Sequence, residues 1–373
     1  LSCKVPKQCM AFLCCRLYLG CYFYSLSCLC ALELVCQQIC AQTEKRVVKL
    51  KLKITIFFIL LSLLTIVILL VNKRDSSDFQ EIIYDNSRNY TYVPLANIGL
   101  SIGIVNDEHD QLIENMNFEL EGTENFQGTI ALVNQNEEEK DYLIVPLINY
   151  KQKKIRLGED YQDKIKITLK PKEIAFIPFH LEDLKEGFHD FIFFIVKDPD
   201  NQNISDEYRI ATTGSYSTIR GTINIGTVKN KSFQKYKKAL EPIEETALDG
   251  ILLTKNRNLK PWLSEEITDE EEIIDFNIKI GNLGENKEKY ALVSLLDWNQ
   301  TAVSSEYKVY FGELSQNSSE IIKGEINTQE IKKNAVSNYT TFLIPHPYEK
   351  VDPYNPEFFI QTSTRVGLYN KQN

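Results

Sequence analysis

Cysteine is missing from most of this chain: all nine cysteines lie between Cys3 and Cys40, and none follows. A secreted domain stapled by disulfides distributes its cysteines through the folded region, and a structural zinc site needs paired Cys or His ligands at fixed spacing. Neither pattern is present, so we expect the residues after Cys40 to fold without disulfides or structural zinc. Many proteins exported by Gram-positive bacteria avoid cysteine, and the Lys-, Asn- and Ile-rich composition indicates a low-GC member of that group.

Signatures of catalysis and of cofactor binding are missing as well. The chain has no Gly-x-Ser-x-Gly nucleophile motif, no Walker A motif and no Gly-x-Gly-x-x-Gly motif. Carboxylates are abundant because the protein is acidic, so their proximity in sequence does not indicate a glycosidase pair. We therefore expect a non-enzymatic protein with no catalytic, cofactor-binding or metal-binding residues. The histidines are few: His109, His180, His189 and His346.

Positive charge is scarce after residue 74. Residues 75–373 hold 32 Lys and Arg against 49 Asp and Glu, a net charge of −17, whereas residues 1–74 hold ten basic and two acidic residues. Binding to a phosphate backbone depends on clustered cations, so we do not expect nucleic acid as a partner.

One long uncharged hydrophobic run is present, ITIFFILLSLLTIVILLV from Ile54 to Val71. As a helix it extends roughly 27 Å, close to the ~30 Å hydrocarbon core of a bilayer. The run exceeds the usual core of a cleaved signal peptide and lacks a small-x-small cleavage site, which favours a single-pass, uncleaved anchor. Five basic residues precede it, so the positive-inside rule predicts a cytoplasmic N-terminus and extracellular residues after 75: Lys45, Arg46, Lys49, Lys51 and Lys53.

The Cys-rich segment 1–47 has two interpretations. The chain begins with Leu1, and translation from a start near Val48 or Leu50 would make this segment upstream sequence rather than protein. Alternatively, residues 17–32 form a second, short membrane helix surrounded by palmitoylated cysteines. We favour the first interpretation because a helix over 17–32 is short for a membrane span.

The chain contains an internal repeat. With residue 129 placed on residue 277, TIALVNQNEEEKDYLIVPLINYKQ (129–152) overlies NIKIGNLGENKEKYALVSLLDWNQ (277–300) without a gap. Each copy has alternating apolar residues, a polar connection and an apolar run, which predicts two strands of a sandwich. Tyr150 and Trp298 end the two copies, and we expect them to pack rather than to bind a ligand. Further along, Ile174–Pro178 is matched with Tyr339–Pro345.

The segment Leu184–Asp190 (LKEGFHD), which precedes the predicted strand Phe191–Val196, resembles the corner before the penultimate strand of Ig-like and fibronectin-III-like surface domains. The resemblance implies a β-sandwich in which Gly187 makes the turn and His189 takes the place of a hydrogen-bonding Tyr. The second copy lacks this glycine, and Pro356–Ile360 is its expected counterpart. The predicted fold is all-β, with two tandem Ig-like β-sandwich domains after one transmembrane helix.

The predicted organisation has five parts. A short helix is expected in the linker, capped by Ser232 and ended by Pro242. The parts are a Cys-rich segment (1–47), a basic flank with the transmembrane helix (48–74), sandwich domain 1 (79–228), a basic linker (229–245) and sandwich domain 2 (246–373).

Four charged clusters are candidate sites. Asp198–Asn203 begins like a calcium loop but has Arg209 where the bidentate Glu belongs, so a turn is expected. Asp107–Asp110 holds three acids and a histidine, whose side chains would alternate between the faces of a strand. The basic cluster is expected to be solvated or to contact anionic wall polymer or lipid headgroups: Lys229, Lys231, Lys235, Lys237 and Lys238. The acidic run is expected to be a solvated loop: Glu265, Glu266, Asp269, Glu270, Glu271 and Glu272.

The leading hypothesis is a non-enzymatic binding or structural module at the surface of a low-GC Gram-positive bacterium, anchored in the bilayer through residues 54–71. Its expected partner is a protein or a cell-wall polymer. The alternative is an accessory subunit of a membrane transport or secretion complex. No cofactor is expected for either.

Overall fold

The computed structural model describes Ser62 and residues 81–85, 99–122, 125–226, 236–238, 248–268 and 272–371. The chain divides into two spatial units, residues 1–78 and residues 79–373. Of the first unit only Ser62 is described, as an exposed residue in helical conformation. The Cys-rich segment and nearly all of the predicted membrane span therefore lie outside the described residues. Within the part of the chain that is described, no helix is long and apolar enough to cross a bilayer.

The first two sheets make up the N-terminal sheet pair, within residues 81–226. The first sheet has the order β2-β4-β10-β7-β8, with β1 also on β10; the second has the order β3-β12-β11-β5-β6, with β9 also on β5. The strands are β1 (Ile83–Asp85), β2 (Leu100–Val105), β3 (Asn117–Leu120), β4 (Phe126–Asn134), β5 (Lys140–Ile148), β6 (Lys151–Gln152), β7 (Ile155–Leu157), β8 (Asp160–Gln162), β9 (Ile165–Leu169), β10 (Ile174–Leu181), β11 (Gly187–Lys197) and β12 (Tyr216–Ile225).

The remaining strands make up the C-terminal sheet pair. The third sheet has the order β13-β19-β17-β21-β23-β15, with β18 on β17 and β22 on β21; the fourth has the order β14-β16-β20. The strands are β13 (Lys237–Lys238), β14 (Gly250–Thr254), β15 (Ser264–Ile267), β16 (Ile273–Asn282), β17 (Glu288–Leu296), β18 (Asn299–Thr301), β19 (Val309–Leu314), β20 (Ser318–Asn327), β21 (Val336–Pro345), β22 (Gln361–Thr362) and β23 (Val366–Asn370). The short helices are α3 (Asp206–Ala211), η1 (Thr212–Gly214), η2 (Thr328–Glu330) and η3 (Pro356–Phe358).

Each sheet pair encloses its own apolar core. Strand β9 shows how: Ile165, Ile167 and Leu169 are buried, while the residues between them face solvent. This period-two pattern buries one face of a strand against the opposite sheet. Clusters of buried apolar side chains fill the space between the first and second sheets and between the third and fourth sheets. The predicted all-β, sandwich-type fold is confirmed at this level.

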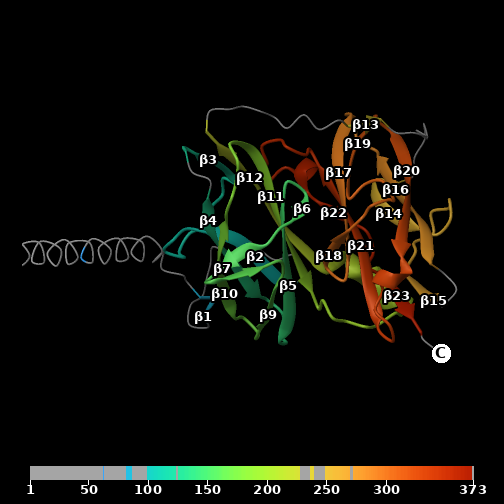
Figure 1. Cartoon of the computed structure of the whole chain (residues 1–373), viewed down its shortest axis with the longest axis horizontal. Helices are drawn as coiled ribbons and strands as arrows, with labels where there is room; N and C mark the ends of the chain where they lie inside the picture. Colours follow the sequence, from blue (N-terminus) through green and yellow to red (C-terminus); the bar gives the residue numbers. More distant parts are fainter. Residues whose placement is uncertain are drawn as a thin grey trace, which may run out of the picture. The chain divides into compact units, whose positions relative to one another are not determined.

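A third apolar layer joins the two sheet pairs. The second and third sheets pack face to face and lie between the first and fourth sheets (Figure 1). Their central strands β5, β11, β17 and β21 are consequently buried on both faces, which explains the long apolar runs of β5, β11 and β17. Strand β21 also buries polar residues: Ser337, Asn338, Thr340 and Thr341. Phe194 of β11 and Phe342 of β21 stack across this layer with their ring centroids 3.8 Å apart. We call this layer, with the polar contacts at its edges, the junction.

The two sheet pairs share one topology. Leu147 pairs with Ile192 between β5 and β11, and their repeat counterparts Leu295 and Thr340 pair in the same register between β17 and β21. The parallel pairing of β3 with β12 is matched by that of β15 with β23. The repeat found in the sequence therefore occupies corresponding strands, β4 to β6 and β16 to β18.

Two of the predicted correspondences are wrong. Strand β10, which contains Ile174–Pro178, pairs with β4 as β20 pairs with β16, so its counterpart is β20; residues 339–345 belong to β21, the counterpart of β11. Residues 356–358 form η3 after β21, and the segment that precedes β21 is 331–335. The counterpart of β10 lies within three residues of the position that the overlay gives, because Ile322 pairs with Ile278 as Ile177 pairs with Ile130, an offset of 145 (322 − 177) against 148. The offset is 148 again between Ile192 and Thr340, so both predicted matches simply lie too late in the chain.

The linker also differs from the prediction. In place of a helix, the described residues 236–238 include strand β13, which pairs in parallel with β19. Tyr236 packs edge-on against Phe311, at 6.2 Å between ring centroids, and this contact together with the strand pairing holds the segment extended along the third sheet.

Removing the ring at the centre of the junction tests whether the sheet pairs unfold together. Replacing Phe342 with Ala leaves a cavity against Phe194, and we expect a loss of about 3 kcal/mol in the free energy of unfolding. The junction depends on this contact, so thermal unfolding should also separate into two transitions in calorimetry. Phe359, which is 53% exposed, supplies the control, and Phe359→Ala should leave both properties unchanged. A single, equally stable transition in Phe342→Ala would contradict the interpretation.

Candidate functional site

The junction is held at one edge by a reciprocal pair of glutamines. The backbone N–H of Gln152 donates to Oε1 of Gln300 at 2.9 Å, and the backbone N–H of Gln300 donates to Oε1 of Gln152 at 2.6 Å. Their side-chain amides donate to the carbonyl oxygens of Trp298 (3.2 Å) and Tyr150 (2.8 Å) respectively. Each residue thus contacts its own repeat counterpart, as across the two-fold axis of a homodimer.

Tyr150 and Trp298, the aromatic residues that end the two copies, are buried in the junction. Both have left-handed backbone conformations, with φ angles of 65° and 66°. The Tyr150 hydroxyl donates to the Asp190 carboxylate and accepts from the backbone N–H of Tyr348. The indole N–H of Trp298 donates to the carbonyl oxygen of Pro199 at 3.1 Å. Both side chains therefore link the two sheet pairs and line no open surface.

Two buried arginines reach across the junction from equivalent positions. Arg220 of β12 donates to the carbonyl oxygens of Pro345 (2.6 Å) and His346 (2.9 Å) in the C-terminal pair. Arg220 also forms an ion pair with the fully buried Asp190 at 3.0 Å. Burial and the charge of Asp190 are the main causes of the raised pKa of the Tyr150 hydroxyl beside them, which keeps that group a donor.

Arg365, just before β23, makes the matching contact in the other direction. Its guanidinium donates to the carbonyl oxygens of Lys197 (3.1 Å) and Asp198 (3.0 Å) in the N-terminal pair. Pro345 and His346 are the repeat counterparts of Lys197 and Asp198, so each arginine binds the same turn of the opposite half. Asp198 and His346 share the left-handed conformation, with φ angles of 47° and 48°.

The second arginine site has no carboxylate where the first has one. Asn338 occupies the register position of Asp190 and accepts from Nη1 of Arg209, a buried residue of α3, at 2.7 Å. Burial and the neighbouring charge of Arg365 lower the pKa of Arg209 to about 10. The two sites therefore differ in charge although their backbone contacts match.

This difference predicts an order of stability for two variants. Arg220→Met leaves the buried Asp190 carboxylate without its cation, which should cost about 3–5 kcal/mol. Arg365→Met leaves only carbonyl and hydroxyl groups unsatisfied, and it relieves the repulsion on Arg209, so we expect a loss of about 1–3 kcal/mol. Urea unfolding of the two variants measures the difference. Equal losses, or a larger loss for Arg365→Met, would refute the assignment of charges.

A cleft of about 1180 Å³ opens where the two sheet pairs meet. Its walls come from β6 and the residues after it, from the corner between β10 and β11, and from β19 with β13. Phe311 and Tyr348 both line it, with their ring centroids 6.0 Å apart. Six lysines line this cleft: Lys151, Lys153, Lys154, Lys185, Lys237 and Lys308.

Lys237 connects the cleft with the basic linker of the sequence analysis. Its ammonium group lies 3.5 Å from the ring centroid of Tyr307, donates to the Tyr307 hydroxyl, and lies 3.9 Å from the Glu306 carboxylate. A cation over an aromatic face is held by the ring quadrupole. Lys238 belongs to the same strand, whereas Lys229, Lys231 and Lys235 lie outside the described residues.

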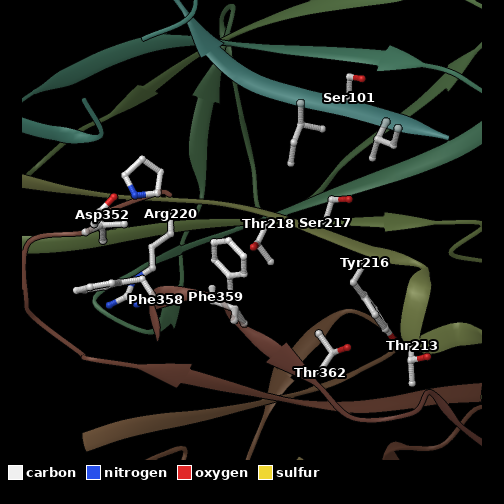
Figure 2. Close-up of a pocket in the computed structure, with 15 residues that line it drawn as sticks. Ser101, Thr213, Tyr216, Ser217, Thr218, Arg220, Asp352, Phe358, Phe359 and Thr362 are labelled. Atoms are coloured by element: carbon white, nitrogen blue, oxygen red, sulfur yellow. The ribbon is translucent and has the colours of Figure 1, made fainter. Parts of the chain in front are cut away.

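A smaller pocket of about 410 Å³ lies between β2, β12 and the segment 351–362. In Figure 2, Ser101 on β2 and Ser217 and Thr218 on β12 lie above Phe359 and Thr362. Arg220 also borders the pocket, but its guanidinium is engaged with Asp190 and the carbonyls of the opposite half. The lining is thus mainly hydroxyl groups and apolar side chains.

The candidate calcium loop is a turn that leads into α3. Asn201 accepts from the backbone N–H of Asn203 at 2.9 Å, and the Ser205 hydroxyl caps the helix. Asp200 is paired with Lys166 at 2.7 Å, and Arg209 is buried in the junction. Among the described residues, no group of three or more His, Cys, Asp and Glu side chains is placed to hold a metal ion.

The cluster Asp107–Asp110 forms a tight turn after β2. The Asn106 side chain accepts from the backbone N–H of Asp110 at 3.1 Å, and His109 stacks on Phe176 with ring centroids 4.5 Å apart. The histidine at the sandwich corner, His189, interacts with the Lys185 carbonyl at 2.6 Å, as the resemblance to Ig-like corners implies. Gly187 begins β11 there with a φ angle of 128°.

The remaining candidates are dispersed. His180 borders the cleft, where burial lowers its pKa, and His346 lies at the turn bound by Arg220. Glu265 of the acidic run is paired with Lys255 at 2.8 Å, while residues 269–271 lie outside the described residues. Within the described part of the chain, no two of the predicted charged clusters therefore come together to form a site. The basic linker alone reaches the cleft, through Lys237.

Burial raises the pKa of one carboxyl group in the third sheet, that of Glu288. Glu288, the first residue of β17, has its pKa raised from 4.5 to about 7 by burial and then by the charges of Asp249 and Glu357. The folded protein therefore holds this proton more tightly than the unfolded chain between pH 4.5 and 7, and stability should fall as the pH rises through that range.

The variant Glu288→Gln tests whether this carboxyl group causes the predicted fall in stability with rising pH. The side chain is partly exposed, so we expect the decline in unfolding free energy between pH 5 and pH 8 to shrink by only about 1 kcal/mol in the variant. Urea titrations at the two pH values give the comparison. Parallel declines in both proteins would show that Glu288 is ionised in the fold.

Comparisons with known proteins give no family. No protein-family model and no curated protein matches the chain. Among solved structures, red sea bream transglutaminase aligns over 74% of this chain at 10% identity and a TM-score of 0.20, and the chain spans only 32% of that enzyme. The CARDB domain of a Pyrococcus furiosus protein in complex with di-metal ions aligns over 34% of this chain and 92% of its own length, at 11% identity and a TM-score of 0.21. A human ASH/PapD-like domain aligns over 39% of this chain and 97% of its own length, at 10% identity and a TM-score of 0.20. TM-scores this low do not establish a shared fold.

Proposed function

We propose that the chain is a non-enzymatic binding protein of the cell surface, made of two tandem Ig-like sandwich domains that arose by duplication. The reciprocal contacts of the junction carry this proposal. Corresponding residues bind each other (Gln152 and Gln300) or bind the same turn of the opposite half (Arg220 and Arg365). Such contacts join the domains into one rigid body, and the cleft beside them is the binding site.

Two of the titratable groups that line the cleft, Glu182 and His189, are already engaged, which supports binding rather than bond cleavage. Most of its lysines are exposed, and Glu182 is occupied by Arg156 at 2.9 Å and by the Tyr161 hydroxyl. His189 interacts with a backbone carbonyl and with the Asn149 amide. A general base needs a free lone pair within reach of a substrate proton, and these partners occupy the two groups.

The proposed placement follows from the hydrophobic run 54–71 and its basic flank. In this proposal the run spans the cell membrane of a low-GC Gram-positive bacterium once, with the N-terminus in the cytoplasm. The two sandwiches then stand outside the cell within reach of wall polymers and surface proteins. Their net charge of −17 keeps them soluble there.

Protease treatment of intact cells that express the full chain tests this placement. We expect the protein in the membrane fraction, with the epitopes of residues 79–373 removed by external protease and an epitope tag fused directly before Val48 protected. A cytosolic control protein should survive the same treatment. Recovery of the chain in the cytosol, or of residues 75–373 free in the medium, would contradict the proposal.

A further inference from the structure

The cleft reverses the charge of the surface around it. Its lining contains six lysines and three acids, Glu182, Asp183 and Glu186, whereas residues 75–373 as a whole carry −17. Two of these charges have partners outside the lining, since Glu182 is paired with Arg156 and Lys237 lies 3.9 Å from the Glu306 carboxylate, so the excess of lysine remains. A concentration of one sign of charge in a cleft raises the local concentration of ligands of the opposite sign. The cleft therefore favours an anionic ligand.

The lysines come from both sheet pairs. Lys151, Lys153 and Lys154 are exposed along the wall formed by β6 and the residues after it, and Lys308 is exposed on the opposite wall beside β19. None of the described residues that line the cleft is an arginine, so these walls present no planar fork to orient a single carboxylate or phosphate. Flexible ammonium groups on both walls instead suit several anionic groups spaced along a chain.

The size and the aromatic residues of the cleft further limit the classes of ligand that fit. About 1180 Å³ exceeds the usual range of pockets for one small molecule, roughly 300–1,000 Å³, so an extended ligand fits better. Tyr161 presents a ring that is 53% exposed, and Phe188 and Phe311 are half-buried in the lining. Flat apolar faces between cations match the alternating apolar faces and charged groups of sugar units.

We propose that the cleft binds an anionic polysaccharide, whose carboxylate or phosphate groups meet the lysines while its sugar rings lie on the aromatic side chains. This inference rests on the proposed function, because it assigns a ligand class to the same cleft. The charged group can be a carboxylate on the sugar or a phosphodiester between units, and the probes below separate these two sources.

Binding of the full-length protein in detergent to immobilised polymers tests the inference. The probes are polygalacturonate (carboxylate), a phosphodiester-linked polysaccharide, neutral dextran and polyglutamate. We expect binding to one or both anionic polysaccharides, none to dextran, and an affinity that falls as salt is raised from about 50 to about 500 mM. The triple variant Lys151→Gln, Lys153→Gln, Lys154→Gln should bind at least about tenfold more weakly, because it removes three of the six cations.

Two controls keep the result specific to the cleft. Lys170→Gln, Lys260→Gln, Lys323→Gln removes the same charge from exposed lysines outside the cleft and should leave the affinity unchanged. Tyr161→Ala should weaken binding to the polysaccharide but not any residual binding to polyglutamate. Circular dichroism and melting curves of each variant establish that the fold is retained.

Several outcomes would overturn the inference. They are equal weakening by the two lysine triples, tighter binding to polyglutamate than to either polysaccharide, or no binding to any anionic probe. In each of these cases a protein that is still exposed on the cell surface leaves the proposed function standing. A chain found in the cytosol refutes the proposed function instead, whatever the polymers show.

Discussion

The structure depends on burying the second and third sheets against each other. Sheets in an ordinary sandwich keep one face in solvent, but β5, β11, β17 and β21 are covered on both faces. Apolar packing is not directional, so by itself it would let one sheet slide over the other at little cost. The alignment of the two sheets therefore needs directional contacts at the edges of the layer. The buried arginines and the glutamine pair supply them.

The paired contacts are what the proposed duplication would produce. When two copies of one unit pack about a two-fold axis, every favourable contact is made twice. Under that proposal the copies diverge after fusion into one chain, and the two arginine sites do differ in charge. Asp190 compensates Arg220, whereas its counterpart Asn338 faces Arg209, so the second site keeps its cations without a carboxylate. The cleft lysines likewise gather where the two sheet pairs meet, so the proposed binding site is single although the junction contacts are paired.

The sequence predicts the strands of the repeat and the sandwich-type fold because alternating apolar residues and a gapless overlay of 129–152 on 277–300 are local signals. The later correspondences fail because the match of Ile174–Pro178 with residues 339–345 passes over β20, whose apolar residues are interrupted by Lys323 and Gly324. Gln152 and Gln300 are matched by the overlay, yet their mutual contact depends on tertiary packing. Arg220 lies within the buried strand β12, but an arginine in a strand is usually exposed, so the sequence alone does not predict its burial. The cleft joins Lys151 to Lys308, residues too distant in sequence for any pattern to connect.

The central claim is that the two sheet pairs behave as one rigid body held by the junction. Hydrogen exchange of the full-length protein tests it most directly, since it reports the opening free energy of each strand. The account predicts that the amides of β5, β11, β17 and β21 exchange most slowly and share one opening free energy. It would be contradicted by two distinct free energies, one for β5 and β11 and another for β17 and β21.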